Sequence, residues 1–335
     1  MVKGSFHWVF TSVAALSFLS LPLFGQDSFN QRAATLEGTP GLFLTWDAEP
    51  LRPGEVFFSS GVLRNHRDPG VITTTSADVG LAIGILPRLE IFGMGEAQKR
   101  VQADAINAYR FLPGGVPQPA ETPTGERLFT MAAPFITVPV GTGHGDVYGN
   151  IKYNFLSERA GKPFSLSALV VGKLPGVKSF SALNRGLTTG DTEVGFATIA
   201  SKRIRDLAQF HVNALWSFTA DPVVEGVAIS DIHHRFLFRA GSGIRVSQPL
   251  QVIGEFQVYD YFGHHVPGLD PTSPVDIIVG VRAFANRFVN LGGAYVASVN
   301  HIQEDASEGV RPAGTSGFIF QFGLTFSQEK LVRKN

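Results

Sequence analysis

The sequence predicts an all-β protein, a transmembrane antiparallel up-and-down β-barrel of about twelve strands. Three observations predict it. Apolar and polar residues alternate with a period of two over most of the 335 residues, and short and long connections alternate between these segments. A secretory signal stands at the N-terminus, and no later stretch approaches the ~20 continuous apolar residues of a membrane helix. A membrane location therefore requires a barrel, because lipid tolerates no unpaired backbone.

The overall composition favours this class and excludes others. The 28 basic residues balance the 28 acidic ones, whereas a nucleic-acid-binding surface normally shows a basic excess. Only 17% of the residues are charged, against roughly 25% in soluble domains. The 37 glycines and 28 phenylalanines fit strands with one side against lipid. Cysteine is absent, so no disulfide or thiolate metal site is available.

The N-terminal 25 residues are expected to be a cleaved signal peptide. Lys3 precedes the apolar stretch Trp8–Leu23, and the small residue Gly25 follows before a polar run. The alternative is a single transmembrane anchor, but the run is short and Pro22 would break its end. We expect export, cleavage near Gly25 and a final location in the bacterial outer membrane, with outer-membrane lipid and the assembly machinery as partners.

The mature chain divides into three parts of different composition. Three prolines interrupt residues 26–53 around the apolar group Leu42–Trp46, which predicts a periplasmic lead or a small plug inside the lumen. Residues 54–326 form the predicted barrel. The charged residues 327–335 are expected to extend into the periplasm as a tail.

The predicted strands are segments in which apolar side chains share one face. The last segment shows this best, because Phe318, Phe320, Phe322 and Leu324 lie at alternate positions and would point to one side of a strand. The predicted ranges are 55–64, 71–86, 89–98, 145–156, 164–174, 191–200, 207–219, 233–246, 250–261, 275–285, 288–299 and 317–326. In addition, Phe135–Val140 could form a short extra strand.

Short turns and long loops alternate along the chain. The short connections are Pro87–Arg88, Ser247–Pro249 and Asn286–Arg287, with slightly longer ones near 157–163 and 201–206. The long connections are 99–144, 175–190, 220–232, 262–274 and 300–316, and only the link near 65–70 breaks the pattern. Outer-membrane barrels sort their loops in this way, with both chain ends on the periplasmic, short-turn side. A soluble β-sandwich or jelly roll, the alternative, also alternates but has no reason to sort its loops.

Several short phrases resemble the outer-membrane barrels grouped as the MetA-pathway phenol-degradation family. They are Gly145-Asp146-Val147 with Ile151-Lys152-Tyr153-Asn154-Phe155, Val171-Gly172-Lys173-Leu174-Pro175, and Gly190-Asp191-Thr192-Glu193-Val194-Gly195. The resemblance covers about residues 143–326, with its specific motifs in 143–200, and it departs at Gly176-Val177, where the family often has Thr-Gly-Asp. It implies a barrel that moves small, often aromatic, compounds across the outer membrane, and it transfers no catalytic or binding residues.

Ionisable residues on the polar faces are the candidate pore lining, because a charge that faced lipid would cost ~2–4 kcal/mol. They are Asp78, Glu90, Glu96, Asp146, Lys152, Lys173, Glu193, His211, Arg235, Arg239, Arg245, Glu255, Asp276 and Arg282. They could form a charged constriction that filters solutes, or a structural network that fills a narrow barrel. A turn centred near Gln248 would place Glu255 opposite Gly241 and diagonal to Arg239, so we expect an ion pair between the two charges.

No catalytic, cofactor-binding or metal-binding site is predicted. Adjacent strand residues point to opposite faces, so neither His233-His234 nor His264-His265 chelates as a pair. The run Gly141–Gly145 lacks the following Lys-Ser/Thr of a phosphate loop. His211 and Ser217 are the best candidates for a hydrolase, but they would lie about 20 Å apart on one strand.

The sequence thus predicts a channel or transporter, not an enzyme, for passive passage of a small solute without a cofactor. The family resemblance implies that this solute could be aromatic or apolar. Two alternatives stay open. One is a closed structural or adhesive barrel, and the other is an outer-membrane hydrolase whose catalytic residues would have to come from several strands.

Overall fold

The computed structural model describes most of the chain. The described residues are 32–67, 72–103, 138–220, 234–263, 273–299 and 316–326, with the short pieces 120–121, 127–129, 133, 136, 223–224, 226–228 and 270–271. The predicted signal peptide and the predicted tail 327–335 lie outside them and stay predictions. Within the described part of the chain, no helix has the length and apolar character needed to cross a membrane.

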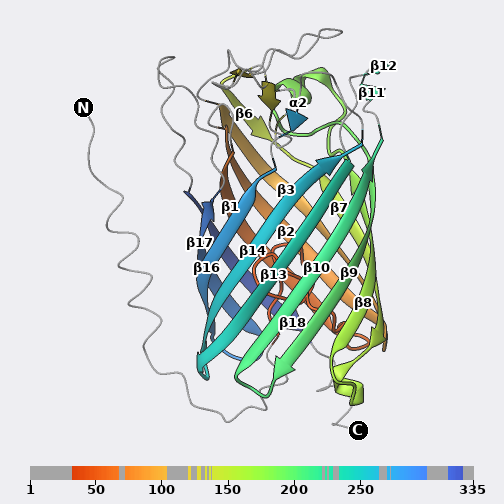
Figure 1. The fold of residues 1–335 in the computed structure, drawn as a ribbon, viewed down its shortest axis with the longest axis vertical. Coiled ribbons are helices and arrows are strands. Elements are labelled where there is room, and N and C mark those ends of the chain that lie inside the picture. The colour runs from red at the N-terminus through yellow and green to blue at the C-terminus, as the bar shows by residue number, and fades with distance from the viewer. Residues whose placement is uncertain are drawn as a thin grey trace, which may run out of the picture.

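Twelve antiparallel strands close into a barrel (Figure 1). They are β1 (Val56–Arg67), β2 (Ile72–Leu86), β3 (Leu89–Ala103), β7 (Val147–Leu156), β8 (Ser165–Leu174), β9 (Glu193–Ile204), β10 (Ala208–Thr219), β13 (His234–Ser247), β14 (Leu250–Phe262), β16 (Val275–Phe284), β17 (Val289–Ser298) and β18 (Ser316–Phe326). Each pairs with the next of the twelve, and β1 pairs with β18 to complete the ring. The twelve-stranded antiparallel barrel predicted from the sequence is therefore confirmed.

Shorter elements lie mainly at the end of the barrel that carries the long loops, which we call the long-loop end. They are β4 (Ala120–Glu121), β5 (Arg127–Phe129), β6 (Val140–Gly143), α2 (Phe180–Asn184), β11 (Val223–Val224), β12 (Val227–Ala228) and β15 (Asp270–Pro271). The opposite end, which we call the short-turn end, carries the 3-10 turn η3 (Glu158–Ala160) between β7 and β8.

An extra strand was predicted at Phe135–Val140, and the structure has β6 at Val140–Gly143, which shares only Val140 with that range. Phe135 and Thr137 lie outside the described residues. Pro139 lacks an N–H group and cannot donate to the ladder, although its carbonyl accepts a hydrogen bond from the N–H of Ala103 at 2.9 Å. Pairing with β6 also explains why β3 continues to Ala103, beyond its predicted end at residue 98.

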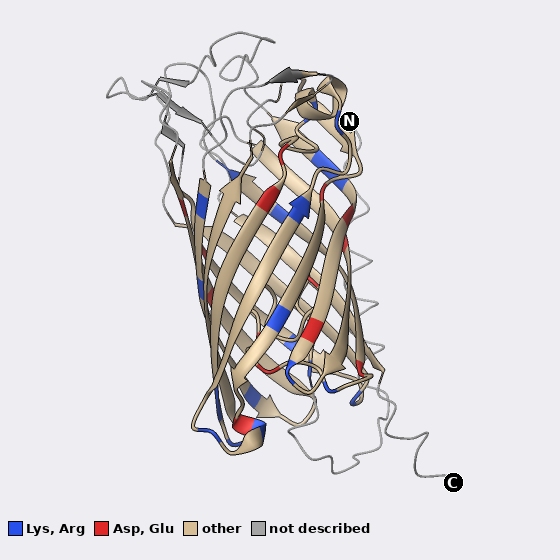
Figure 2. Cartoon of the chain, turned by 90° about the vertical axis from the view of Figure 1, so that its right-hand side faces the viewer, with Lys and Arg blue, Asp and Glu red and all other residues tan. Residues whose placement is uncertain are grey.

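The two faces of the barrel wall differ in their chemistry. Large apolar side chains cover the outside, where Leu81, Phe196 and Val279 are each about 55% exposed, as expected for a surface that meets lipid. Charged positions are spread over the height of the wall (Figure 2). Many of these side chains are buried inside the barrel, among them Asp78, Glu90 and Glu255. Lys152 and Arg282 are fully buried there.

Residues 32–55 lie inside the barrel toward the short-turn end, and we call them the luminal segment (red to orange in Figure 1). Isolated β-bridges between Ala34 and Pro40 and between Gly41 and Trp46 fold this segment into tight loops. Its apolar side chains are buried against the wall. Trp46 belongs to one apolar core that is shared with wall strands, and Phe43 belongs to a second.

Glycines of the wall let the luminal segment approach the strands closely. A Cβ on Gly80 of β2 would lie 2.7 Å from the Cα of Gly38, which itself has a φ of 94°. A Cβ on Gly292 of β17 would lie 2.7 Å from the ring of Phe43. Side chains at these two wall positions would therefore collide with the segment. The inward-facing glycines make room for it.

Candidate functional site

The lumen has two parts of different character. The luminal segment fills the part toward the short-turn end, and a polar cavity of about 220 Å³ lies toward the long-loop end. The inward-facing charges of the wall divide between these parts. Those beside the luminal segment bind its backbone and side chains, and those around the cavity mainly bind one another.

A buried ion pair between Glu90 of β3 and Lys152 of β7 holds the luminal segment on one side. The two charged atoms are 3.0 Å apart, and both side chains are fully buried. Glu90 accepts hydrogen bonds from the hydroxyl of Thr39, at 2.5 Å, and from the backbone N–H of Leu51, at 2.7 Å. Lys152 donates to the carbonyl of Asp47 at 3.1 Å. Each charge thus has several partners, as burial of a charge requires.

Glu255 of β14 holds the segment from the other side. Its carboxylate accepts hydrogen bonds from the backbone N–H groups of Phe43, Leu44 and Thr45, at 2.7, 3.1 and 2.7 Å. The Thr45 hydroxyl donates to it as well, at 2.5 Å. Consecutive N–H groups that converge on one anion form a nest, a common anion-binding arrangement of the backbone.

The register predicted around Glu255 is confirmed, but the predicted ion pair is wrong. Gly241 does lie opposite Glu255. Arg239, however, pairs with Glu37 of the luminal segment at 3.0 Å and donates to the carbonyl of Leu44 at 2.8 Å. The two wall charges do not pair with each other, because both bind the luminal segment, where Glu255 accepts from the N–H of Leu44 and Arg239 donates to its carbonyl.

Arg282 of β16 binds the carbonyl groups of the same loop. Its guanidinium donates to Gly41 at 3.0 Å, to Leu42 at 2.8 Å and to the side chain of Gln321 at 2.9 Å. It also lies 5.1 Å from the centre of the Phe43 ring, in cation–π geometry. Arg282 and Glu255 therefore hold the loop by its carbonyl and N–H groups respectively.

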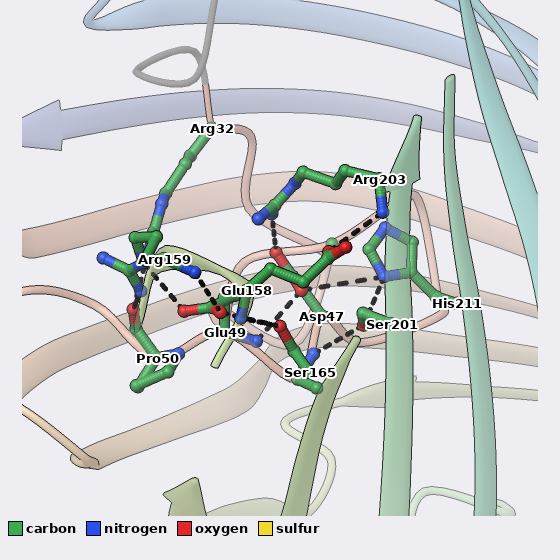
Figure 3. A network of polar contacts seen from close by, with 12 residues as sticks. Arg32, Asp47, Glu49, Pro50, Glu158, Arg159, Ser165, Ser201, Arg203 and His211 are labelled. Carbon is green, nitrogen blue, oxygen red and sulfur yellow. Dashed lines mark hydrogen bonds and ion pairs between the residues drawn. The ribbon is translucent and has the colours of Figure 1, made fainter. Parts of the chain in front are cut away.

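A third group of contacts fixes the luminal segment at the short-turn end (Figure 3). Arg203 forms an ion pair with Asp47, and Arg159 forms one with Glu49 at 2.7 Å. Glu49 also accepts hydrogen bonds from Ser157 at 2.7 Å and Ser165 at 2.6 Å. We call Asp47, Glu49, Arg159 and Arg203 the acidic anchor.

The charges of the acidic anchor shift the pKa values of its carboxyl groups. Burial alone would raise the pKa of Asp47, but Arg203, together with the other positive charges and the backbone hydrogen bond around this carboxyl group, outweighs burial and holds the pKa well below its usual range. Burial likewise opposes ionisation of Glu49, yet Arg159 and the two serine hydroxyls lower its pKa. Both carboxyl groups are therefore charged in the folded protein at neutral pH.

His211 does not form a catalytic triad. Its Nδ1 lies 2.7 Å from the Ser201 hydroxyl and 3.7 Å from Asp47, so both neighbours share one ring nitrogen. A triad needs the nucleophile and the acid on opposite ring nitrogens. Ser217, the predicted partner of His211, lies further along the same strand, β10.

The histidine pairs give no metal site in the described part of the chain. His234 lies against the rings of Phe218 and Phe262 at the long-loop end. His233 and the pair His264-His265 lie outside the described residues. Among the residues that are described, no group of three or more His, Asp or Glu side chains could hold a metal ion.

Charged side chains and tyrosines line the cavity at the long-loop end. Lys173 of β8 lies 2.7 Å from Asp191, 3.5 Å from Glu193 and 3.7 Å from Asp146. Arg235 of β13 also pairs with Glu193, at 2.8 Å. The remaining polar lining includes Arg67, Glu96, Lys99, Tyr148, Thr189, Tyr259 and Tyr261. This cavity can hold a small polar molecule.

The predicted pore-lining residues fall into three places. Six contact the luminal segment or lie close to it: Glu90, Lys152, His211, Arg239, Glu255 and Arg282. Five line the cavity and two lie behind it: Glu96, Asp146, Lys173, Glu193 and Arg235, then Asp78 and Asp276. Arg245 lines a separate pocket of about 50 Å³ at the short-turn end.

Sequence reasoning missed several residues of the lumen. Glu37, Asp47 and Glu49 lie in the luminal segment, which has no regular alternation that would point them to particular wall residues. Tyr148 and Tyr261 were missed for a different reason. They are on wall strands, and their positions on the inward face could have identified them.

A closed antiparallel barrel with an apolar outside and a polar inside is a transmembrane β-barrel of the outer-membrane class. No family model and no curated protein sequence matches the chain, so the resemblance to the MetA-pathway family stays a prediction. Solved structures do match. A COG4313 outer membrane channel from Pseudomonas putida F1 shares 13% identity, with 84% of this chain and 98% of that chain covered, at a TM-score of 0.56.

Two other solved structures align less well. A KdgM porin shares 5% identity over 82% of this chain and 98% of its own, with a TM-score of 0.41. A mutant of the TodX monoaromatic hydrocarbon channel shares 7% identity over 91% of this chain and 98% of its own, also with a TM-score of 0.41. The COG4313 channel thus shares the fold of this chain, and identities this low leave the solute open.

Proposed function

We propose that this protein is a bacterial outer-membrane channel for passive passage of a small solute. The short-turn end would face the periplasm, and the luminal segment would act as a plug. The observation that carries the proposal is the polar cavity of about 220 Å³ inside an apolar wall, separated from the short-turn end by a segment that non-covalent contacts hold against the wall. The similarly folded COG4313 protein is an outer membrane channel, which supports this class of function.

The plug role rests on how the luminal segment is held. Wall side chains bind it chiefly through its backbone, as Glu255 binds Phe43 and Arg282 binds Leu42. Such hydrogen bonds can exchange with water when the segment moves, because water offers both donors and acceptors. A plug of this kind would limit passage while it is seated and permit passage when it shifts.

The proposal is tested by single-channel conductance of the refolded mature protein, residues 26–335, in a planar bilayer. The chain has no cysteine, so a single engineered disulfide can lock the plug. Leu42→Cys with Gly241→Cys is suitable, because a Cβ at Gly241 would lie 2.7 Å from the Leu42 side chain. The matched control is each single cysteine variant.

We expect discrete conductance steps from the unmodified protein and from the reduced double variant. Oxidation should lower the conductance of the double variant, and it should leave the conductance of each single cysteine variant unchanged. Equal conductance of the oxidised and reduced forms, with the disulfide verified, would show that the segment is not the gate. Insertion without conductance in every state would overturn the channel proposal and favour a closed structural or adhesive barrel, which the filled lumen also fits.

We also propose that the protein reaches the outer membrane by export and loses residues 1–25. The basic start and the apolar stretch Trp8–Leu23 support this. Fractionated membranes and the intact mass of the purified protein are the measurements. A mass equal to that of a chain that begins near Gln26 supports the proposal. A mass equal to that of the full chain, with residues 1–25 present, would instead support an N-terminal anchor.

A further inference from the structure

The cavity at the long-loop end has more carboxylates than cations around it. Four cations and four carboxylates line it: Arg67, Lys99, Lys173 and Arg235, with Glu96, Asp146, Asp191 and Glu193. Two further buried carboxylates lie directly behind the lining. Asp276 pairs with Arg67 at 2.8 Å, and Asp78 accepts a hydrogen bond from the lining residue Ser76 at 3.1 Å. Six carboxylates thus face four cations among the described residues.

Every one of the four cations already has a carboxylate partner. The pairs are Arg67 with Asp276, Lys99 with Glu96, Lys173 with Asp191, and Arg235 with Glu193. The surplus falls on Asp146 and Asp78. Asp146 is 3.7 Å from Lys173, whose closer partner is Asp191. The cavity therefore offers no cation without an acidic partner among the described residues, which disfavours an anionic occupant and leaves acceptor oxygens for a cationic one.

Asp191 supplies an independent sign of a missing partner. Its residue is only 1% exposed, and it lines the cavity. Lys173 and Thr189 both donate to Oδ1. In the described part of the chain, Oδ2 has no hydrogen-bond partner. A buried carboxylate oxygen without a donor is unfavourable, and an ammonium group would provide that donor.

Tyrosine rings form another part of the lining. Tyr148 comes from β7, and Tyr259 and Tyr261 come from β14. Arg67 lies 6.0 Å from the centre of the Tyr259 ring, so this ring already accepts a cation at its face. Organic ammonium ions are recognised in proteins by such combinations of aromatic faces and carboxylates. Tyr148 and Tyr261 could serve the same purpose for a bound solute.

The size of the cavity limits the occupant. A cavity of about 150 Å³ can hold benzene, and pockets for drug-sized ligands begin near 300 Å³. The volume here, about 220 Å³, lies between these values. It therefore suits one ring with a short side arm, or an aliphatic amine of similar size.

We propose that this cavity is a binding site for a small organic cation, with the ammonium group at Asp191 and Asp146 and the body of the solute against the tyrosines. The inference rests on the proposed channel function, since it names the class of solute that the channel would admit. The site lies on the long-loop side of the luminal segment, so a solute would bind there before it met the plug.

The test is isothermal titration of the refolded mature protein with benzylammonium. Benzyl alcohol is the matched neutral probe, and benzoate is the matched anion. We expect benzylammonium to bind about ten-fold or more tightly than either, since a charge-assisted hydrogen bond accounts for a difference of this size. Equal binding of benzyl alcohol, or tighter binding of benzoate, would overturn the proposal, as would no binding of benzylammonium.

Variants locate the site. Asp191→Asn keeps the shape and the Oδ1 acceptor, and it should weaken benzylammonium binding about ten-fold without loss of the folded barrel. Asp146→Asn should weaken it too. Asp206→Asn makes the same charge change in the exposed turn at the short-turn end and should leave binding unchanged. Undiminished binding by folded Asp191→Asn and Asp146→Asn would place the cation elsewhere and overturn the assignment.

The binding test and the conductance test can fail separately. Benzylammonium binding without conductance would remove the channel function and leave the cation site in place. Conductance without such binding would leave the channel and remove the site. A block of single-channel current by benzylammonium, absent in Asp191→Asn, would connect the two.

Discussion

The carboxylate of Glu255 accepts a hydrogen bond from the backbone N–H of Phe43 at 2.7 Å, although 212 residues separate them in the sequence. Phe43 lies in the luminal segment, and Glu255 lies on a strand of the barrel wall. The next two N–H groups of the segment converge on the same carboxylate. The ring of Phe43 is buried in an apolar core with the wall, so one short loop is held by both polar and apolar contacts.

Replacement of Glu255 should therefore loosen the luminal segment. Glu255→Ala leaves the N–H groups of residues 43–45 without their acceptor, at a cost of roughly 1–3 kcal/mol for each group that stays buried. Glu255→Gln keeps one acceptor oxygen and should have a smaller effect. Hydrogen exchange of the backbone amides of residues 43–45 is the measurement, and Asp206→Ala, in an exposed turn, is the control. Unchanged exchange in Glu255→Ala would contradict the role of this carboxylate.

Wall glycines provide a second test, through close packing. Gly80→Ala places a Cβ 2.7 Å from the backbone of Gly38, so the luminal segment must shift. We expect a loss of about 1–3 kcal/mol in the free energy of unfolding, as for other overpacked sites. Gly254→Ala is the matched control, because its Cβ would meet nothing within 4 Å. Urea unfolding in lipid vesicles compares the two, and equal losses would rule out contact with the segment as the cause.

The sequence was sufficient to predict the strands of the barrel wall, but it did not predict how the luminal segment is held inside them. Strands could be predicted because each must present apolar residues such as Phe320 to the outside at alternate positions. The luminal segment obeys no such rule. Its partners bind backbone groups, which are the same in every residue, so nothing in the side-chain pattern pointed Glu255 to Phe43. The register correctly placed Glu255 near Arg239, but Glu37, 202 residues away, forms the ion pair with Arg239.

The position of a residue along the barrel height should decide the effect of a charge on the outer face. Phe320 lies within β18 and is 51% exposed, and Phe326 ends the same strand and is 55% exposed. Phe320→Arg should destabilise the inserted barrel by about 2–4 kcal/mol, and Phe326→Arg by only about 0–1 kcal/mol. The free energy of unfolding from vesicles measures both. Equal effects would mean that the membrane does not surround the wall at the depth of Phe320.

The acidic anchor makes the seating of the luminal segment depend on pH. The carboxyl groups of Asp47 and Glu49 both have lowered pKa values in the folded protein, as a result of Arg203 and Arg159. A carboxyl group of this kind stabilises the fold above its unfolded pKa, near 4, and this stabilisation is lost as the pH falls toward the lower folded value. The segment should therefore stay seated at neutral pH and loosen below about pH 4.

Conductance recorded between pH 7 and pH 3 tests directly whether the luminal segment loosens as the pH falls. We expect a low, steady conductance down to about pH 4 and an increase below it. Glu49→Gln removes one of the two carboxylates, so it should raise the conductance at neutral pH and make the acid response smaller. A conductance that stays unchanged down to pH 3, or an acid response of full size in Glu49→Gln, would contradict the role of the acidic anchor.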